Sequence, residues 1–133
     1  MIEEMFRCIH GDMCIAYFLR SWCENGEYAH DNLTFEILSL KAGIAIYKME
    51  DYFCRKIGMK PICWRNKIRI YKSVELMHRF RTAAIANIGL NVGFNDRRNF
   101  SKTFISMIGM SPSEYRQKSL HKGRLGIYFT LSR

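Results

Sequence analysis

Two matching stretches decide the fold of this chain: FCRKIGMKPICWR at residues 53–65 and FISMIGMSPSEYR at residues 104–116. They share a phenylalanine, an Ile-Gly-Met turn, a proline and an aromatic-Arg pair, each repeated at a distance of 51 residues. Just upstream, Ala42-Gly43-Ile44 matches Val92-Gly93-Phe94 at a distance of 50 residues. The chain therefore holds two copies of one supersecondary unit, and the second copy has gained one residue between its glycine and its phenylalanine.

Each copy is predicted to fold as a helix, a glycine turn and a second helix, because apolar residues recur at helical spacing on both sides of the turn. In the first copy they are Leu33, Phe35, Leu38, with Leu40 as a further candidate, and then Ile46, Met49, Tyr52 and Phe53. In the second copy they are Ile85, Ile88 and Val92, then Phe100 and Phe104, with Asn95 or Asp96 as the N-cap of the later helix. A tight glycine turn between two short helices predicts a helix-turn-helix unit.

Two more helices are predicted outside the copies. Ile62 to Arg81 forms one long linking helix, and about Asp12 to Cys23 forms a helix at the front that caps the first unit. In the linking helix the residues expected to pack inward are Ile68, Val74, Leu76 and Met77, whereas those expected to point elsewhere are Arg65, Lys67, Arg69, Lys72 and Arg79. The front helix has Ile15, Phe18, Leu19 and Trp22 on one face.

The predicted fold class is therefore all-α, with two helix-turn-helix subdomains joined by a long linking helix. The predicted segments are 1–32 (N-terminal segment with the capping helix), 33–61 (first helix-turn-helix), 62–81 (linking helix), 82–117 (second helix-turn-helix) and 118–133 (basic C-terminal tail).

The formal net charge of +9 is distributed unevenly along the chain. Residues 1–50 have four Lys/Arg against eight Asp/Glu, a net of −4, and residues 51–133 have seventeen against four, a net of +13. A basic excess confined to one portion indicates a polyanionic partner, for which nucleic acid is the first candidate and an anionic membrane surface the second.

Other classes of function find little support in the sequence. The five cysteines form no C-x-x-C pair, so neither a disulfide framework nor a metal site is predicted; Cys8-x-His10 followed by Cys14 comes nearest to one. Reduced thiols suit a cytoplasmic protein, and the longest apolar run, Met13 to Leu19, is too short to span a membrane. No nucleophile elbow, phosphate loop or paired-carboxylate site indicates an enzyme, and no cofactor is expected.

The second copy resembles the DNA-binding signature of AraC-type transcription regulators. The resemblance is carried by IANIGLNVGFND (85–96), FSKxF (100–104) and GxSPSEYR (109–116), and more loosely by the first copy, so that it covers about residues 33–117. It implies an all-helical domain whose two recognition helices enter successive major grooves about 34 Å apart, which a linking helix of about 20 residues nearly spans. Residues 1–32 are too few for an effector-binding domain, so the chain resembles the stand-alone MarA and SoxS group.

The resemblance places the family's base-contacting positions on Arg97, Arg98 and Lys102, with Asn99 beside them. Arginine pairs bidentately with guanine, and Phe100 and Phe104 are expected to turn inward. Double-stranded DNA is the implied partner, with RNA polymerase as the second. The alternative is that these residues form a solvated basic face.

The first copy departs from the family pattern. Ile46, Tyr47, Glu50 and Asp51 stand where the second copy has Arg97, Arg98, Ser101 and Lys102, and Ala45 replaces the usual serine cap. Two carboxylates near phosphates predict weakened binding, although Tyr47 can still stack on a base or touch a thymine methyl group. The predicted phosphate contacts are Lys48, Arg55, Arg65, Lys67, Arg69 and Lys72, together with backbone N–H groups at helix starts.

Two functions follow from these residues. The first is a sequence-specific DNA-binding regulator that reads the major groove mainly through the second helix-turn-helix. The second is a regulator-like protein that acts through protein–protein interaction with another transcription factor and binds DNA weakly or not at all, which the acidic pair Glu50-Asp51 favours.

Overall fold

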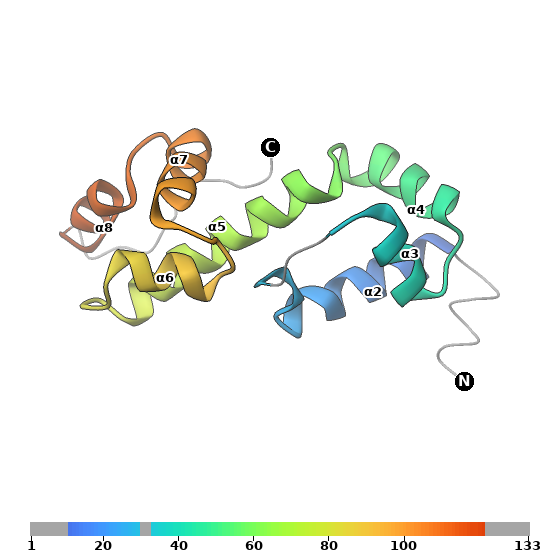
Figure 1. Cartoon of the computed structure of the whole chain (residues 1–133), viewed down its shortest axis with the longest axis horizontal. Helices are drawn as coiled ribbons and strands as arrows, with labels where there is room; N and C mark the ends of the chain where they lie inside the picture. Colours follow the sequence, from blue (N-terminus) through green and yellow to red (C-terminus); the bar gives the residue numbers. More distant parts are fainter. Residues whose placement is uncertain (1–10, 30–32, 122–133) are drawn as a thin grey trace. The chain divides into compact units, whose positions relative to one another are not determined.

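The computed structural model describes residues 11–29 and 33–121, which are helical and contain no strand (Figure 1). The chain divides into two compact units, Met1–Arg65 and Asn66–Arg133. The predicted all-α class with two helix-turn-helix units is confirmed. The division between the two units falls inside one long helix and not at its ends. It therefore does not test the boundaries of the five predicted sequence segments, which stay predictions.

The first unit contains a front helix, a helix-turn-helix and the start of the long helix. Its elements are α2 (Gly11–Glu24), the short 3-10 helix η1 (Glu27–Ala29), α3 (Phe35–Ala42), α4 (Ile46–Tyr52), the π-helical segment η2 (Phe53–Ile57) and the beginning of α5 (Pro61–Arg79). The bounds of α2 and α5 lie within two residues of those predicted for the front and linking helices.

The core of the first unit is built around Phe53. Its ring makes edge contacts with Phe35 and with Trp64, each with ring centroids 5.5 Å apart, and Trp64 in turn lies 4.9 Å from Trp22 of α2. These aromatic contacts tie three helices to the one that carries Phe53, and edge-to-face geometry adds to the area that they bury. Leu40 does not join them: its side chain is 83% exposed, because two residues after the buried Leu38 a helix faces the opposite way.

In the first unit, α3 and η2 each end at a glycine, Gly43 and Gly58. Thr34 caps α3 by accepting a hydrogen bond from the Ile37 amide at 3.1 Å, and Gly43 ends this helix at φ 70°, a conformation that favours glycine. The segment after α4 differs from the expected α-helix, since its last turn widens into η2 before Gly58 ends it. The helices that follow the two turns begin at Ile46 and Arg97, 51 residues apart, so the extra residue of the second copy lies in its turn.

The second unit contains the rest of α5 with α6 (Ile85–Asn91), α7 (Arg97–Ile108) and α8 (Pro112–His121). Its core is a continuous series of aromatic contacts, in which successive ring centroids are 5.3, 5.8 and 5.9 Å apart: Phe94, Phe100, Phe104 and Tyr115. Helix α8 extends to His121, into the predicted tail; residues 122–133 lie outside the described part.

The orientation predicted for Arg69 is wrong. Its side chain is only 3% exposed, and its guanidinium lies over the ring of Phe94, 5.5 Å from the centroid. A cation over an aromatic face keeps part of its electrostatic stabilisation when it leaves water. Arg69 is therefore part of the second unit's interior, while Ile70, Val74 and Met77 supply the buried apolar residues of this part of α5.

Helices α6 and α7 approach closely at Gly89. A Cβ atom at this position would lie 2.7 Å from Cδ2 of Phe100, well inside van der Waals contact. The matching residue of the first unit is Ser39, and the slimmer Met49 stands at the position of Phe100. The phenylalanine at the centre of the second unit thus requires a glycine on the helix that it packs against.

We expect Gly89→Ala to destabilise the protein, because the added methyl group must displace a buried ring. Overpacking of this kind costs about 1–3 kcal/mol, which urea denaturation of the purified chain would measure. Asn87→Ala, at an exposed position of the same helix, is the matched control and should change stability by less than about 0.5 kcal/mol. Equal stabilities of the two variants would contradict the close approach.

A polar cluster joins α5 to α8 beside this core. His78 Nε2 lies 3.4 Å from the Tyr115 hydroxyl and 3.3 Å from Ser119 Oγ. Burial, and then the positive charge of Arg81, hold the pKa of His78 below its usual 6.5. Burial raises the pKa of Tyr115, so the phenol keeps its proton at neutral pH.

The lowered pKa of His78 predicts a pH dependence of stability. Below about pH 6.5 the unfolded chain binds a proton at this histidine that the folded chain resists, so stability falls as the pH drops from 6.5 toward the folded pKa. Melting temperatures measured between about pH 8 and pH 5 should fall less steeply for His78→Gln, which cannot be charged. Parallel profiles for the two proteins would rule out this contribution.

Candidate nucleic-acid interface

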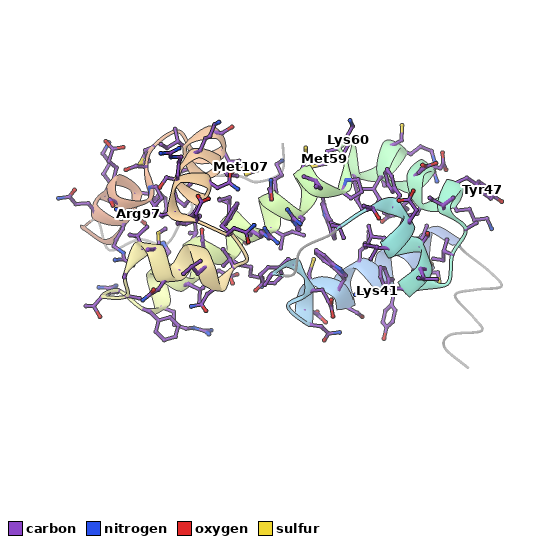
Figure 2. The ribbon with its side chains drawn as sticks, viewed as in Figure 1. Lys41, Tyr47, Met59, Lys60, Arg97 and Met107 are labelled. Carbon is purple, nitrogen blue, oxygen red and sulfur yellow. The ribbon has the colours of Figure 1, made fainter. Side chains whose placement is uncertain are left out.

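The outward face of α7 is set by its two buried phenylalanines. Phe100 and Phe104 have no exposed surface, and Asp96 caps the helix by accepting a hydrogen bond from the Asn99 amide at 2.7 Å. Of the two N-cap candidates in the sequence, Asn95 and Asp96, the structure shows that Asp96 caps the helix. With this register fixed, the side chains expected to touch bases are all exposed: Arg97, Arg98, Asn99 and Lys102 (Figure 2, where Arg97 is labelled).

These cations form an uncompensated positive surface, which we call the α7 basic face (Arg97, Arg98 and Lys102). Arg98 and Lys102 are four residues apart and share one side of the helix, and α7 contains no carboxylate. In the part of the chain that the structure describes, none of the three takes part in an ion pair. Guanidinium and ammonium groups so placed are free to donate to guanine O6 and N7 or to phosphates.

The corresponding face of α4 has the same scaffold and a different chemistry. Met49 and Phe53 are buried as Phe100 and Phe104 are, so Tyr47, Glu50 and Asp51 face outward; Tyr47 is 65% exposed and stands at one end of the molecule's first unit in Figure 2. We call Ile46, Tyr47, Glu50 and Asp51 the α4 acidic face. As predicted, Ala45 provides no side-chain hydrogen bond at the start of this helix.

One carboxylate of the α4 acidic face is neutralised within the helix. Arg55 Nε donates to Asp51 Oδ2 at 2.6 Å, an ion pair at i, i+4 spacing. While this pair holds, the carboxylate of Asp51 offsets the charge that Arg55 would bring to a phosphate. Lys48 is exposed and remains a candidate for that contact.

The structure places the predicted phosphate contacts of α5 in different surroundings. Arg65 and Lys67 are half-buried, and Lys72 lies 3.6 Å from Glu75 in an i, i+3 ion pair. Because Arg69 is buried with its guanidinium over the ring of Phe94, it is no longer a candidate. Lys60, just before α5, is exposed and is a further candidate for a phosphate contact that the sequence analysis did not name. Its position next to Pro61, the first residue of the helix, could have indicated it.

The start of α8 is closed by its own side chains. Ser111 Oγ accepts from the Glu114 amide at 3.1 Å, and Glu114 Oε1 accepts from the Ser111 amide at 3.0 Å. This reciprocal pair is a capping box, which the Ser-x-x-Glu spacing alone could have predicted. These two amides are thus occupied and Pro112 has no N–H group, so only the Ser113 N–H of this helix start stays a candidate for a phosphate contact.

Within residues 11–29 and 33–121, no three His, Cys, Asp or Glu side chains gather in a way that could hold a metal ion. Cys8 and His10, the nearest approach to a metal pattern, lie outside the described residues. Of the helices described, none is both long enough and apolar enough to cross a membrane.

Comparisons with known proteins agree with this arrangement. A family model described as a helix-turn-helix domain matches residues 38–118, and the arabinose operon regulatory protein of Escherichia coli is 33% identical over 95 residues. This chain belongs to the AraC-type helix-turn-helix family. The resemblance predicted from the second copy is confirmed.

Further relatives extend the family assignment. The transcriptional activator RhaR of Pectobacterium carotovorum is 30% identical over 87 residues, which are 65% of this chain and 30% of that protein. The match to the arabinose regulator covers 68% of this chain and 32% of the regulator, so the chain spans about a third of the length of these relatives. The C-terminal domain of AraT, a response regulator from Geobacillus stearothermophilus, has the same fold with a TM-score of 0.69, 20% identity and coverage of 88% of this chain and 91% of that one.

The two recognition helices should respond differently to changes at their caps. Removing the carboxylate cap by Asp96→Ala should cost about 1 kcal/mol, and adding a cap by Ala45→Ser should stabilise by a few tenths of a kcal/mol up to about 1 kcal/mol. Chemical denaturation of both variants measures these changes. A loss of stability in Ala45→Ser would show that the α4 start does not accept a side-chain cap.

Proposed function

We propose that this protein is a sequence-specific DNA-binding transcription regulator that reads the major groove mainly through α7. The observation that carries the proposal is the α7 basic face, an exposed row of three cations held in place by two buried phenylalanines. A rigid helix with cations on its outer side satisfies both needs of direct readout: a fixed register and donors for base edges. The family relationship supports the same function.

The proposed roles follow from side-chain chemistry. Arg97 and Arg98 donate to guanine O6 and N7, Asn99 is suited to adenine, and Lys102 extends the contact along one side of the helix. In the first unit the exposed ring of Tyr47 is proposed to touch a thymine methyl group or to stack on a base.

The remaining basic residues serve affinity rather than sequence choice. Lys48, Arg65, Lys67 and Lys72 are proposed to contact phosphates, as is Arg55 when it leaves Asp51. A regulator bound in this way acts on transcription through RNA polymerase, which is the second partner that we propose.

Alanine substitution in α7 tests the proposal, with α4 as an internal control. Arg97→Ala/Arg98→Ala should weaken binding to an enriched DNA site at least tenfold and relax base preference, since one bidentate pair discriminates by about 1–3 kcal/mol. Ile46→Ala/Tyr47→Ala alters the matching positions of the first unit and should have a smaller effect. Fluorescence anisotropy with a labelled duplex measures both.

Salt dependence provides the second readout of the same titrations. Affinity of the wild-type protein should fall steeply as salt rises, because phosphate contacts release counterions. Binding that is absent, or that does not respond to salt, would refute DNA recognition by this chain.

The α4 acidic face favours a second candidate function, a regulator-like protein that pairs with another transcription factor. Glu50 is an exposed carboxylate and Asp51 is paired with Arg55 of η2, so neither favours a phosphate. If the acidic pair is what prevents DNA binding, Glu50→Gln/Asp51→Arg should restore it in the anisotropy titration. Weak binding by both the wild type and this variant would favour the protein-interaction function.

A further inference from the structure

The α4 acidic face presents a surface that a phosphate backbone would not favour. Glu50 has no ion-pair partner among the residues that the structure describes, whereas Asp51 is bound to Arg55. Next to them lie the exposed ring of Tyr47 and the half-exposed Ile46. The face therefore combines the negative charge of Glu50 with an aromatic and an aliphatic side chain, so its charge complements a cationic protein surface.

The chain itself contains a surface of complementary chemistry. The α7 basic face has three cations at the equivalent positions of the other unit, and Ile105, one turn further along, is 47% exposed. The two faces have matched frames, since α7 has 12 residues and α4 with η2 has 7 and 5. Buried aromatic residues hold both frames, so neither face needs to be ordered before it makes a contact.

We propose that the α4 acidic face of one molecule docks onto the α7 basic face of a second copy of this chain when DNA is absent. This inference rests on the proposed function, because the surface that is covered is the one assigned to DNA. A contact between two different surfaces of identical chains is heterologous, so each molecule can use both of its faces.

The contact is supported by two kinds of interaction. In the proposed contact, Glu50 of one molecule pairs with α7 cations of the second, which form no ion pair within the described part of the chain. The ring of Tyr47 packs against an α7 arginine of the second molecule in a cation–π contact. Exposed ion pairs and cation–π contacts are individually weak, so the association is reversible and sensitive to salt. DNA has a far denser array of negative charge, so it displaces the second copy from the α7 basic face.

Analytical ultracentrifugation of the full chain tests the docking directly. At about 0.1 M NaCl the weight-average mass should rise with protein concentration, and at about 1 M NaCl, where the Debye length shortens from about 10 to about 3 Å, the dissociation constant should increase at least tenfold. An equimolar DNA duplex should also convert the associated protein to a DNA-bound form with one chain. A monomer at every concentration and salt would overturn the proposal.

Charge reversal identifies the two faces. Glu50→Lys/Asp51→Lys makes both faces basic, and Arg97→Glu/Arg98→Glu makes both acidic, so each variant alone should be monomeric. An equimolar mixture pairs each reversed face with its complement and should associate again. Association that persists in each variant alone, or a mixture that stays monomeric while both variants keep wild-type circular dichroism, would overturn the assignment.

A separate DNA titration keeps this result distinct from the proposed function. At nanomolar protein, where weak self-association is negligible, Glu50→Lys/Asp51→Lys should still bind DNA and Arg97→Glu/Arg98→Glu should not. Intact DNA binding without self-association would reject only the docking, and self-association without DNA binding would reject only the proposed function.

Discussion

An edge-to-face contact between two aromatic rings fixes the recognition helix in each unit. Phe53 meets Trp64 at 5.5 Å in the first unit, and Phe104 meets Tyr115 at 5.9 Å in the second. Each pair joins the helix after the glycine turn to the helix that begins at the following proline. Because this contact holds the phenylalanine on the buried side, it fixes the rotation of the helix about its axis and so determines which residues face solvent. Every functional assignment depends on that rotation.

The two units keep this interior and differ in what they show to solvent. The buried apolar positions differ between the units mainly in side-chain volume, as Met49 and Phe100 do. On the preceding helix, the corresponding residue is Ser39 in the first unit and the smaller Gly89 in the second. The charge of the exposed side chains changes sign, from the carboxylates of α4 to the cations of α7. Selection for a packed core acts on the first set alone, so a duplicated fold can hold two surfaces with different partners.

The internal repeat and the apolar spacing predicted most of the fold, because glycine turns and buried phenylalanines leave local patterns in a sequence. The burial of Arg69 could not be predicted, since its partner ring, Phe94, comes from the turn between α6 and α7, far along the chain. The exposure of Leu40 and the π-helical end of α4 likewise depend on packing. By contrast, the Asp51–Arg55 pair follows from i, i+4 spacing and was available from the sequence. The base-contacting roles of Arg97, Arg98, Asn99, Lys102 and Tyr47 stay predictions.

Guanine methylation interference on an enriched site shows whether the two similar helix-turn-helix frames present unequal DNA-reading surfaces. A methyl group at guanine N7 blocks a major-groove contact at the base that carries it. We expect strong interference in one major-groove segment, where α7 binds. Two segments of equal strength, about 10 base pairs apart, would show that both helices read DNA alike and would contradict it.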